Sequence, residues 1–337
     1  MKVALVGRCI NTNSGQGVYK ASGQLYDALK QYTNLEIVKI DGNVCSHSLI
    51  KRLFFDLVSC PIKVLFSKAD VYHFLMPDVC LPLLFSKKLR NKSVVTLHDA
   101  VPMKANDRKN SYVWYMNKMA RIARKAKLII VPSEEAKEDV INYFNVDKRK
   151  ISFIPWCVDL DFMKKVKVTK SKKTTVGFLG GLGSRKNADW LIKAAKEFQD
   201  FEFIIGGKGP ELENLIELKK ELKVNNVNLV GFIPEKEIPK FYSSLDIFVF
   251  PSLFEGFGMP WIEAMACEVP YIIGGNTAIA KSLPIIKINS YEDLINSLKN
   301  IKNRKTKPLK DSRKWLIKNK FTWQEHARKT LEVYKKC

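Results

Sequence analysis

The feature that most constrains the fold is an alternation of two kinds of segment along the chain. Short apolar runs bounded by Gly, Pro or Asn alternate with longer segments whose apolar residues recur with the period of a helix. Consecutive parallel strands need a crossover connection, which is usually a helix, so this alternation is typical of parallel sheets. We therefore predict an α/β protein built from doubly wound parallel sheets.

The alternation occurs in two blocks. The first begins with an apolar run, a glycine-bearing loop and a helix whose apolar face includes Val18, Leu25 and Leu29. Buried strands are predicted in this block at residues 3–7, 35–40, 71–75, 93–97, 128–133 and 151–155. The polar, basic stretch 155–175 predicts a linker. Strands are predicted in the second block at residues 176–180, 201–207, 227–232 and 245–252.

Length and composition agree with two soluble domains inside the cell. The 337 residues fit two domains of roughly 150 residues each. The first fifteen residues hold an apolar stretch too short for a signal peptide, and no later run of about 18 apolar residues could span a bilayer. Seven cysteines without a CxxC pair argue against a disulfide framework or a cysteine zinc site. We therefore expect a cytoplasmic protein.

The formal charge of +23 is the unusual bulk property. It favours an anionic partner, and the candidates are nucleic acid, an acidic membrane surface or a phosphorylated substrate. The alternative is that lysine simply solvates the surface.

The strongest candidate site is "FPSLFEGFGMPWIEAMACEVP", residues 250–270. In open parallel sheets, ligands bind beyond the carboxyl ends of the strands, and this stretch follows a fully apolar strand. Gly256 and Gly258 allow the backbone to approach a ligand, and Pro260 suits the start of a helix. Glu255 then lies at the strand exit and Glu263 about one turn into the helix, so both can face one crevice.

Two interpretations of this stretch remain open. Amides at a helix start suit an anion, and ionised carboxylates accept hydrogen bonds from paired sugar hydroxyls. Alternatively, Glu263 only complements the helix dipole and Glu255 is exposed to solvent.

Three other loops carry weaker signals. In "GGLGSRKN", Arg185 and Lys186 precede a helix that Asn187 or Asp189 could cap, and such cations can clamp a diphosphate, although they can equally be solvated surface. In "TLHDAVP", His98 ends a buried strand, where it could bond a sugar hydroxyl or a leaving phosphate or only terminate the strand. "NTNSGQG" could bring backbone amides to a phosphate through Gly15 and Gly17, but neither it nor "GGKGP" matches a complete phosphate-loop pattern.

Taken together, these motifs resemble the retaining glycosyltransferases of family 4, also called glycosyl transferases group 1. "EGFGMPWIE" has that family's two glutamates separated by seven residues, and "GGLGSRKN" and "TLHDAVP" resemble its phosphate and histidine loops. "IPWCVDLDF" resembles its interdomain connection, and "FTWQEHARKTLEVYKKC" its last helix. The resemblance implies the GT-B fold, in which two Rossmann-like domains, here 1–160 and 161–320, face a central cleft and a final helix, 321–337, returns to the first domain.

The resemblance also implies roles for the site residues in transferring a hexose from a UDP- or GDP-linked sugar. On the donor sugar and nucleotide, Glu263 would bind the ribose diol, Glu255 would face the sugar, and amides from Gly256, Phe257, Gly258 and Met259 would contact its hydroxyls. On the diphosphate, Arg185 and Lys186 would neutralise charge, with Gly15 and Gly17 closing over it and His98 lying near the sugar on the acceptor side. Neither a metal ion nor a cofactor would be required.

The sequence departs from the family pattern in two places. Many members have an arginine where this chain has Gly181, so the clamp would rest on Arg185 and Lys186 alone. The segment after "YIIGGN" lacks an acidic residue often found there, which leaves the acceptor open. The acidic pair Asp159 and Asp161 lies in the connection, and we interpret it as structural.

The charge and the family together suggest a glycan or lipid-linked acceptor and contact with an anionic membrane. Residues 48–68 and 112–127 both mix apolar and basic positions, and one of them could lie on the inner face of the membrane. Ordinary amphipathic packing with solvated lysines is the alternative. A same-fold epimerase or phosphorylase, or a basic nucleic-acid-binding protein, remains a rival, although no recognition helix or stacking surface is evident and we expect no nucleic-acid partner.

Overall fold

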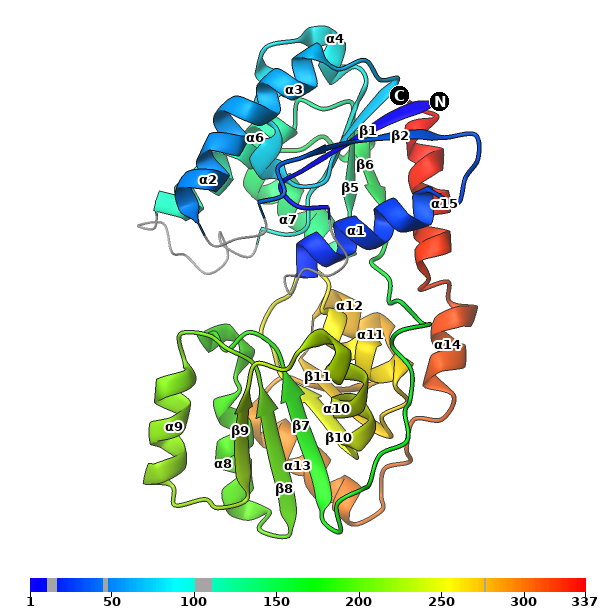
Figure 1. Ribbon diagram of the computed structural model, residues 1–337. Coiled ribbons are helices and arrows are strands. Elements are labelled where there is room, and N and C mark those ends of the chain that lie inside the picture. The colour runs from blue at the N-terminus through cyan, green and yellow to red at the C-terminus, as the bar shows by residue number, and fades with distance from the viewer. Residues whose placement is uncertain (11–16, 45–47, 101–110, 276) are drawn as a thin grey trace. The chain divides into compact units, whose positions relative to one another are not determined.

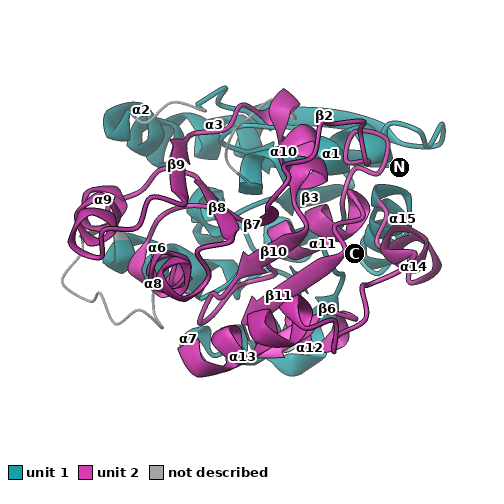
Figure 2. Ribbon diagram, turned by 90° about the horizontal axis from the view of Figure 1, so that it is seen from below, with its two compact units in different colours: residues 1–157, 323–337 teal, residues 158–322 magenta. Residues whose placement is uncertain are grey.

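The described part of the chain forms two compact units (Figure 2). The computed structural model describes residues 1–10, 17–44, 48–100, 111–275 and 277–337. Unit 1 comprises Met1–Cys157 and Trp323–Cys337, and unit 2 comprises Val158–Thr322. These divisions fall close to the domain boundaries predicted at 160/161 and 320/321.

Unit 1 contains a six-stranded parallel sheet with the order β2-β1-β3-β4-β5-β6 (Figure 1). Every strand predicted in the first block is present. The expectation that all are buried was wrong for β2 and β6, which are edge strands with partly exposed side chains. The strands are β1 (Lys2–Gly7), β2 (Glu36–Asp41), β3 (Val71–Phe74), β4 (Ser93–Thr96), β5 (Leu128–Val131) and β6 (Ile151–Phe153).

The helices of unit 1 include the last one in the sequence, α15, which packs against α1. Between β2 and β3, three helical segments follow one another without a break (Figure 1). The longer elements are α1 (Gly17–Leu29), α2 (Leu49–Phe54), the π-helix η1 (Phe55–Ser59), α3 (Cys60–Phe66), α6 (Ser111–Ala123), α7 (Glu134–Phe144) and α15 (Trp323–Tyr334). The short ones are η2 (Pro77–Val79), η3 (Leu81–Leu84), α4 (Lys87–Arg90) and η4 (Lys148–Lys150).

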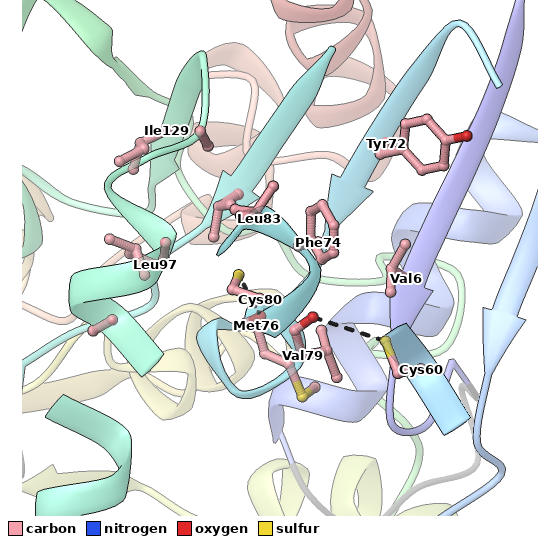
Figure 3. Close-up of a cluster of buried hydrophobic side chains, with 14 of the residues drawn as sticks. Val6, Cys60, Tyr72, Phe74, Met76, Val79, Cys80, Leu83, Leu97 and Ile129 are labelled. Atoms are coloured by element: carbon pink, nitrogen blue, oxygen red, sulfur yellow. Dashed lines mark hydrogen bonds between the residues drawn. The ribbon is translucent and has the colours of Figure 1, made fainter. Parts of the chain in front are cut away.

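The core of unit 1 joins the sheet to the helices that cover it (Figure 3). Phe74, the last residue of β3, and Leu97, which directly follows the neighbouring strand β4, are both buried. Cys60 of α3 donates a hydrogen bond through its Sγ to the Val79 carbonyl at 3.8 Å, which ties α3 to η2. Five cysteines of the described residues are free, whereas Cys9 is disulfide-bonded. The cysteine spacing, which argued against a disulfide framework, therefore did not predict this single bond.

Unit 2 contains a second six-stranded parallel sheet, with the order β12-β11-β10-β7-β8-β9. Two of its strands, β11 and β12, were not predicted, because one ends in two glycines and the other has only three residues. The strands are β7 (Thr174–Leu179), β8 (Phe201–Gly206), β9 (Val227–Gly231), β10 (Ile247–Phe250), β11 (Tyr271–Gly275) and β12 (Ile286–Ile288). The helices are η5 (Ser184–Lys186), α8 (Asp189–Glu197), α9 (Leu212–Glu221), η6 (Glu235–Glu237), α10 (Ile238–Ser244), α11 (Met259–Ala266), α12 (Ala278–Ser282), α13 (Tyr291–Lys302) and α14 (Ser312–Lys318).

Both sheets reverse their strand order at one point, which is where open α/β sheets bind ligands. In unit 2 the reversal lies between β7 and β10, and in unit 1 between β1 and β3. The connection at the start of unit 2 is held by Asp159, whose Oδ1 accepts hydrogen bonds from the backbone N–H groups of Asp161 (3.0 Å) and Phe162 (3.1 Å). This geometry agrees with a structural role for Asp159. No helix among the described residues combines the length and apolar character needed to cross a bilayer.

Candidate active site

Two loops meet at the strand-order reversal of unit 2. One follows β7 and contains η5, and the other follows β10 and leads into α11. The backbone N–H of Leu253 donates to the Arg185 carbonyl at 2.9 Å, and the Asn187 side chain donates to the Pro251 carbonyl at 3.0 Å. Asn187 therefore joins the loops, and the prediction that it or Asp189 caps α8 was wrong because no side chain caps that helix.

Glu255 is the centre of a polar cluster between these loops. Its Oε1 accepts hydrogen bonds from Arg185 Nη1 (2.8 Å), from Ser252 Oγ (2.5 Å) and from the Lys186 ammonium group. Burial alone would raise the pKa of Glu255, but the charges of Lys186 and Arg185 and these hydrogen bonds outweigh it and lower the pKa. Glu255 is therefore ionised, and the interpretation of it as a solvent-exposed residue does not hold, since its side chain is only 10% exposed.

The two cations are held by further contacts. Arg185 Nη1 also donates to the Phe254 carbonyl at 2.6 Å, and its guanidinium lies 5.7 Å from the Phe254 ring centre. Lys186 is almost buried, with its ammonium 4.6 Å from the centre of the Phe250 ring. Arg185 Nε and Nη2 and Glu255 Oε2 make no hydrogen bond within the described residues. The two cations and one carboxylate carry one net positive charge. The free N–H groups of Arg185 and the free oxygen of Glu255 remain able to bind a ligand.

The loop enters α11 through a glycine that no other residue could replace without strain. Gly258 has φ +84°, and a Cβ atom there would lie 2.3 Å from the Trp261 ring. Gly256 and Phe257 are buried, and the Phe257 ring packs 6.4 Å from that of Phe321. Met259 is the first residue of the helix. The side chains thus anchor the loop, and its backbone groups are the part that can contact a ligand.

Glu263 lies in the second turn of α11 and has a different partner. It accepts a hydrogen bond at 3.0 Å from the hydroxyl of Tyr242, a fully buried residue of α10. Burial and the nearby Glu263 charge raise the pKa of Tyr242, so the phenol remains a donor. The contacts therefore place Glu255 with the cations and Glu263 with Tyr242. Nothing in the sequence pointed to Tyr242, which falls on the apolar face of a short helix.

His98 follows β4 in unit 1 and is held in one orientation. Its Nε2 lies 2.8 Å from the Leu75 carbonyl, and its ring meets that of Trp156 edge to face at 5.0 Å. Burial lowers the pKa of His98 to about 4, so the ring is neutral. Since a carbonyl only accepts, Nε2 carries the proton and Nδ1 is an acceptor. Nδ1 is buried without a partner among the described residues, which favours a hydroxyl over a phosphate as its ligand.

Of the two glycines expected to approach the diphosphate, the structure describes only Gly17. Gly15 lies outside the described residues. Gly17 is the first residue of α1, and a Cβ atom there would meet nothing within 4 Å. Packing within unit 1 therefore does not explain a glycine at position 17.

A buried ionic network that was not predicted lies at the strand-order reversal of unit 1. Arg8, directly after β1, donates through Nε to both carboxylate oxygens of Asp56 (2.9 and 3.0 Å) and through Nη1 pairs with Asp78. Tyr115 of α6 donates to Asp56 at 3.0 Å. Burial raises the pKa of Asp78 to about 6 despite the Arg8 charge. The partners are far apart in sequence, so no local pattern could have revealed them.

The fold and the cluster at its strand-order reversal define the class of protein. Two six-stranded parallel sheets, each reversing its strand order once, are the two sheets of a GT-B fold. Residues 159–323 match the family described as "Glycosyl transferases group 1", and residues 37–162 match "Glycosyltransferase Family 4". Together these matches span residues 37–323, and the chain belongs to the group 1 glycosyltransferases of family 4, as its motifs predicted.

Relatives identified by sequence are also glycosyltransferases. The chain is 27% identical over 235 residues, 61% of its length, to the uncharacterized glycosyltransferase MJ1607 of Methanocaldococcus jannaschii, of which it spans only 59%. It is 27% identical over 287 residues to the O-antigen chain mannosyltransferase RfbU of Salmonella typhimurium, covering 77% of this chain and 78% of RfbU. An Escherichia coli UDP-Gal:alpha-D-GlcNAc-diphosphoundecaprenol alpha-1,3-galactosyltransferase is 30% identical over 197 residues, about half of each chain.

Solved structures share the fold at low identity. Anabaena Alr3699/HepE, crystallised with UDP and glucose, superposes with a TM-score of 0.75 at 15% identity, covering 99% of both chains. The sucrose-phosphate synthase of Thermosynechococcus elongatus superposes with a TM-score of 0.80 at 17% identity, covering 99% of this chain and 98% of that one.

Proposed function

We propose that this enzyme transfers a hexose from a UDP- or GDP-linked sugar to a glycan or lipid-linked acceptor, with retention of configuration and without a metal ion or cofactor. The observation that carries the proposal is the cluster of Arg185, Lys186 and Glu255 where the loops after β7 and β10 meet. Its residual positive charge and unused donors suit a diphosphate.

The cluster fits the charge that this reaction develops. Breaking the bond between the anomeric carbon and the donor diphosphate leaves the bonding electrons, and hence negative charge, on the phosphate oxygen. Arg185 and Lys186 are fixed before the reaction by Glu255 and by the loop backbone, so they can stabilise that charge without reorganising. Glu255 Oε2 and the amides of residues 256–259 would bind the sugar hydroxyls.

Glu263 would accept hydrogen bonds from the ribose diol. Tyr242 holds one of its carboxylate oxygens at 3.0 Å, which fixes the carboxylate in one orientation. In unit 1, His98 would accept a hydrogen bond from a sugar hydroxyl through Nδ1. The backbone contacts of Gly15 and Gly17 with the diphosphate stay predictions from the family resemblance.

The names of the relatives support a hexose donor and a membrane-linked acceptor. RfbU is named as a mannosyltransferase of O-antigen chains, and the Escherichia coli relative is named for UDP-Gal and a diphosphoundecaprenol-linked acceptor. An enzyme acting on such an acceptor meets it at a membrane surface. Peripheral contact with the cytoplasmic face of a membrane is therefore part of the proposal.

Calorimetric titration tests the donor site directly. UDP and GDP are titrated into the purified protein with EDTA present, and Glu263→Ala serves as the control. The proposal expects saturable binding of one nucleotide that the substitution weakens by tenfold or more, in line with about 1.5–3 kcal/mol for a hydrogen bond to a charged group. No binding of either nucleotide would contradict it.

A further inference from the structure

The three helical segments between β2 and β3 expose an apolar face to solvent. We call residues 49–66, which comprise α2, η1 and α3, the outer helix. Eight of its large apolar side chains are at least 43% exposed, and Ile50 and Phe66 exceed 80%. They are Leu49, Ile50, Phe54, Leu57, Val58, Ile62, Leu65 and Phe66.

Packing within unit 1 does not account for this face. The opposite side of the outer helix is already buried in the core through Phe55, Cys60 and Val64. A surface helix normally turns polar residues outward, and a contiguous exposed apolar patch marks an interaction site.

Residues 112–127, the other segment of mixed apolar and basic character, behave differently. The apolar side chains Val113, Met119 and Ala120 of α6 are buried, and the basic residues that follow face solvent. Trp114 is the one large apolar side chain of the segment's described residues that is strongly exposed. Ordinary amphipathic packing therefore explains α6 but not the outer helix.

The charges beside the apolar face are positive. On residues 48–68, Lys51, Lys63 and Lys68 are exposed, while Asp56, the only acidic residue of the segment, is buried against Arg8. A surface pocket of about 450 Å³ at the carboxyl end of the outer helix is lined by four lysines and one acidic residue. These are Lys2, Lys68, Lys88, Lys92 and Asp70.

We propose that the outer helix is the membrane-binding surface of this enzyme and lies in the interface of an anionic bilayer. This inference rests on the proposed function, because a lipid-linked acceptor gives the enzyme a reason to bind there. Apolar side chains would enter the acyl boundary, while the lysines would meet lipid phosphates. A second copy of the chain is a poorer occupant, since a symmetric interface on this face would bring like charges together.

The position of the outer helix connects the membrane to the acceptor side of unit 1. The helix begins after β2, at the carboxyl edge of the sheet, and ends before β3, at the amino edge (Figure 1). Its 18 residues span about 27 Å at 1.5 Å per residue. At its middle, Asp56 is bound to Arg8 at the end of β1. A bilayer against this helix would therefore run alongside the edge where ligands bind in such sheets.

Vesicle flotation of the full-length protein tests the inference without donor or acceptor. The protein is expected to float with vesicles of phosphatidylcholine and phosphatidylglycerol and much less with phosphatidylcholine alone. Phe54→Ser combined with Phe66→Ser should weaken binding tenfold or more, the fold-change for losing one or more buried apolar side chains. Lys63→Glu combined with Lys68→Glu should weaken it at least fivefold for each lysine.

Matched variants in unit 2 give the controls. Phe232→Ser with Ile317→Ser removes two exposed large apolar side chains, and Lys172→Glu with Lys220→Glu reverses two exposed lysines. Both should float like the parent, and Trp114→Ser should also retain binding. If thermal melting shows that the Phe54→Ser, Phe66→Ser variant is not folded, Ile50→Asp is tested in its place, because the Ile50 side chain is 81% exposed.

Three results would overturn the inference. The first is no flotation with anionic vesicles, and the second is an equal loss of flotation in the unit 2 controls. The third is that the parent protein is a dimer that does not bind vesicles and becomes monomeric when Phe54 and Phe66 are replaced by serine. Calorimetry with UDP and GDP on the same variants separates this inference from the proposed function. Intact nucleotide binding without flotation would reject the membrane surface alone.

Discussion

Arg185 donates a 2.8 Å hydrogen bond to Glu255 across two loops that follow neighbouring strands of the second sheet. Lys186 shares the same carboxylate oxygen, so one acidic residue holds both cations of the proposed diphosphate clamp. In the proposed function Glu255 would therefore hold the clamp as well as bind the sugar, a double role that the family resemblance did not imply.

Replacing Glu255 with Gln should therefore destabilise the protein as well as slow transfer. It leaves Lys186 nearly buried without its counter-charge, and breaking such a pair costs about 3–5 kcal/mol. Urea unfolding measures this loss. Adding Lys186→Met should recover part of the stability but not the transfer rate. A double variant whose loss of stability equals the sum of the losses in the two single variants would show that the pair is not coupled.

Lys186→Ala should mainly slow transfer, by about 10²–10³, because its charge matters most when the diphosphate departs. Nucleotide affinity should change far less. The measurement is kcat with a saturating donor alongside calorimetric binding. A wild-type transfer rate would show that the diphosphate lies elsewhere.

Tyr242→Phe should weaken nucleotide binding by about tenfold without altering the fold. The substitution removes only the hydroxyl that orients Glu263, and a hydrogen bond to a charged group contributes about 1.5–3 kcal/mol. Calorimetry with the preferred nucleotide measures the change in affinity, and Glu263→Ala should lose more affinity than Tyr242→Phe. Tyr271→Phe, which removes the hydroxyl of a partly exposed tyrosine of unit 2, is the control. Unchanged affinity in Tyr242→Phe would remove Tyr242 from the site.

The sequence was sufficient for the parts of the fold that are locally encoded. Apolar runs and turn residues specified the strands of the first block and placed Glu255, Arg185 and Lys186 at strand ends, where the structure joins them. It did not reveal β12, because three residues carry no period.

Side chains that act through distant partners escaped the sequence for a different reason. Tyr242 and Glu263 are 21 residues apart, and Arg8 and Asp56 are 48 apart, so only the folded chain brings them together. The outer helix was a hypothesis shared with residues 112–127, since amphipathic composition is the same whether the apolar face is buried or exposed. Burial in the structure distinguishes the two segments.

Gly258→Ala should be strongly destabilising, and Gly17→Ala should not. A methyl group at Gly258 would collide with Trp261 in a left-handed backbone conformation, which costs several kcal/mol, roughly 2–4. At Gly17 the space is open, and alanine favours the helix by about 0.5–1 kcal/mol. Thermal unfolding of both variants makes the comparison. Equal stability of the two would mean that the loop before α11 adopts another conformation.

Stability of unit 1 should fall as the pH drops below about 6.5, because three of its histidines are buried and neutral. Burial lowers the pKa of His73 to about 3 and those of His98 and His326 to about 4. Between pH 6.5 and 4 the unfolded chain binds protons that the folded chain does not, so the free energy of unfolding decreases with falling pH, by up to about 1.4 kcal/mol per unit for each histidine.

Hydrogen exchange at pH 7.5, 6.0 and 5.0, corrected for the intrinsic rates, checks this expectation unit by unit. Amides of the sheet in unit 1 should lose protection as the pH falls to 5.0. Unit 2 has no histidine, and the lowered pKa of Glu255 affects stability only at more acidic pH, so its amides should keep their protection over this range. Equal loss in both units would assign the pH dependence to the overall charge, whereas constant protection in unit 1 would mean that its histidines are not held neutral by burial.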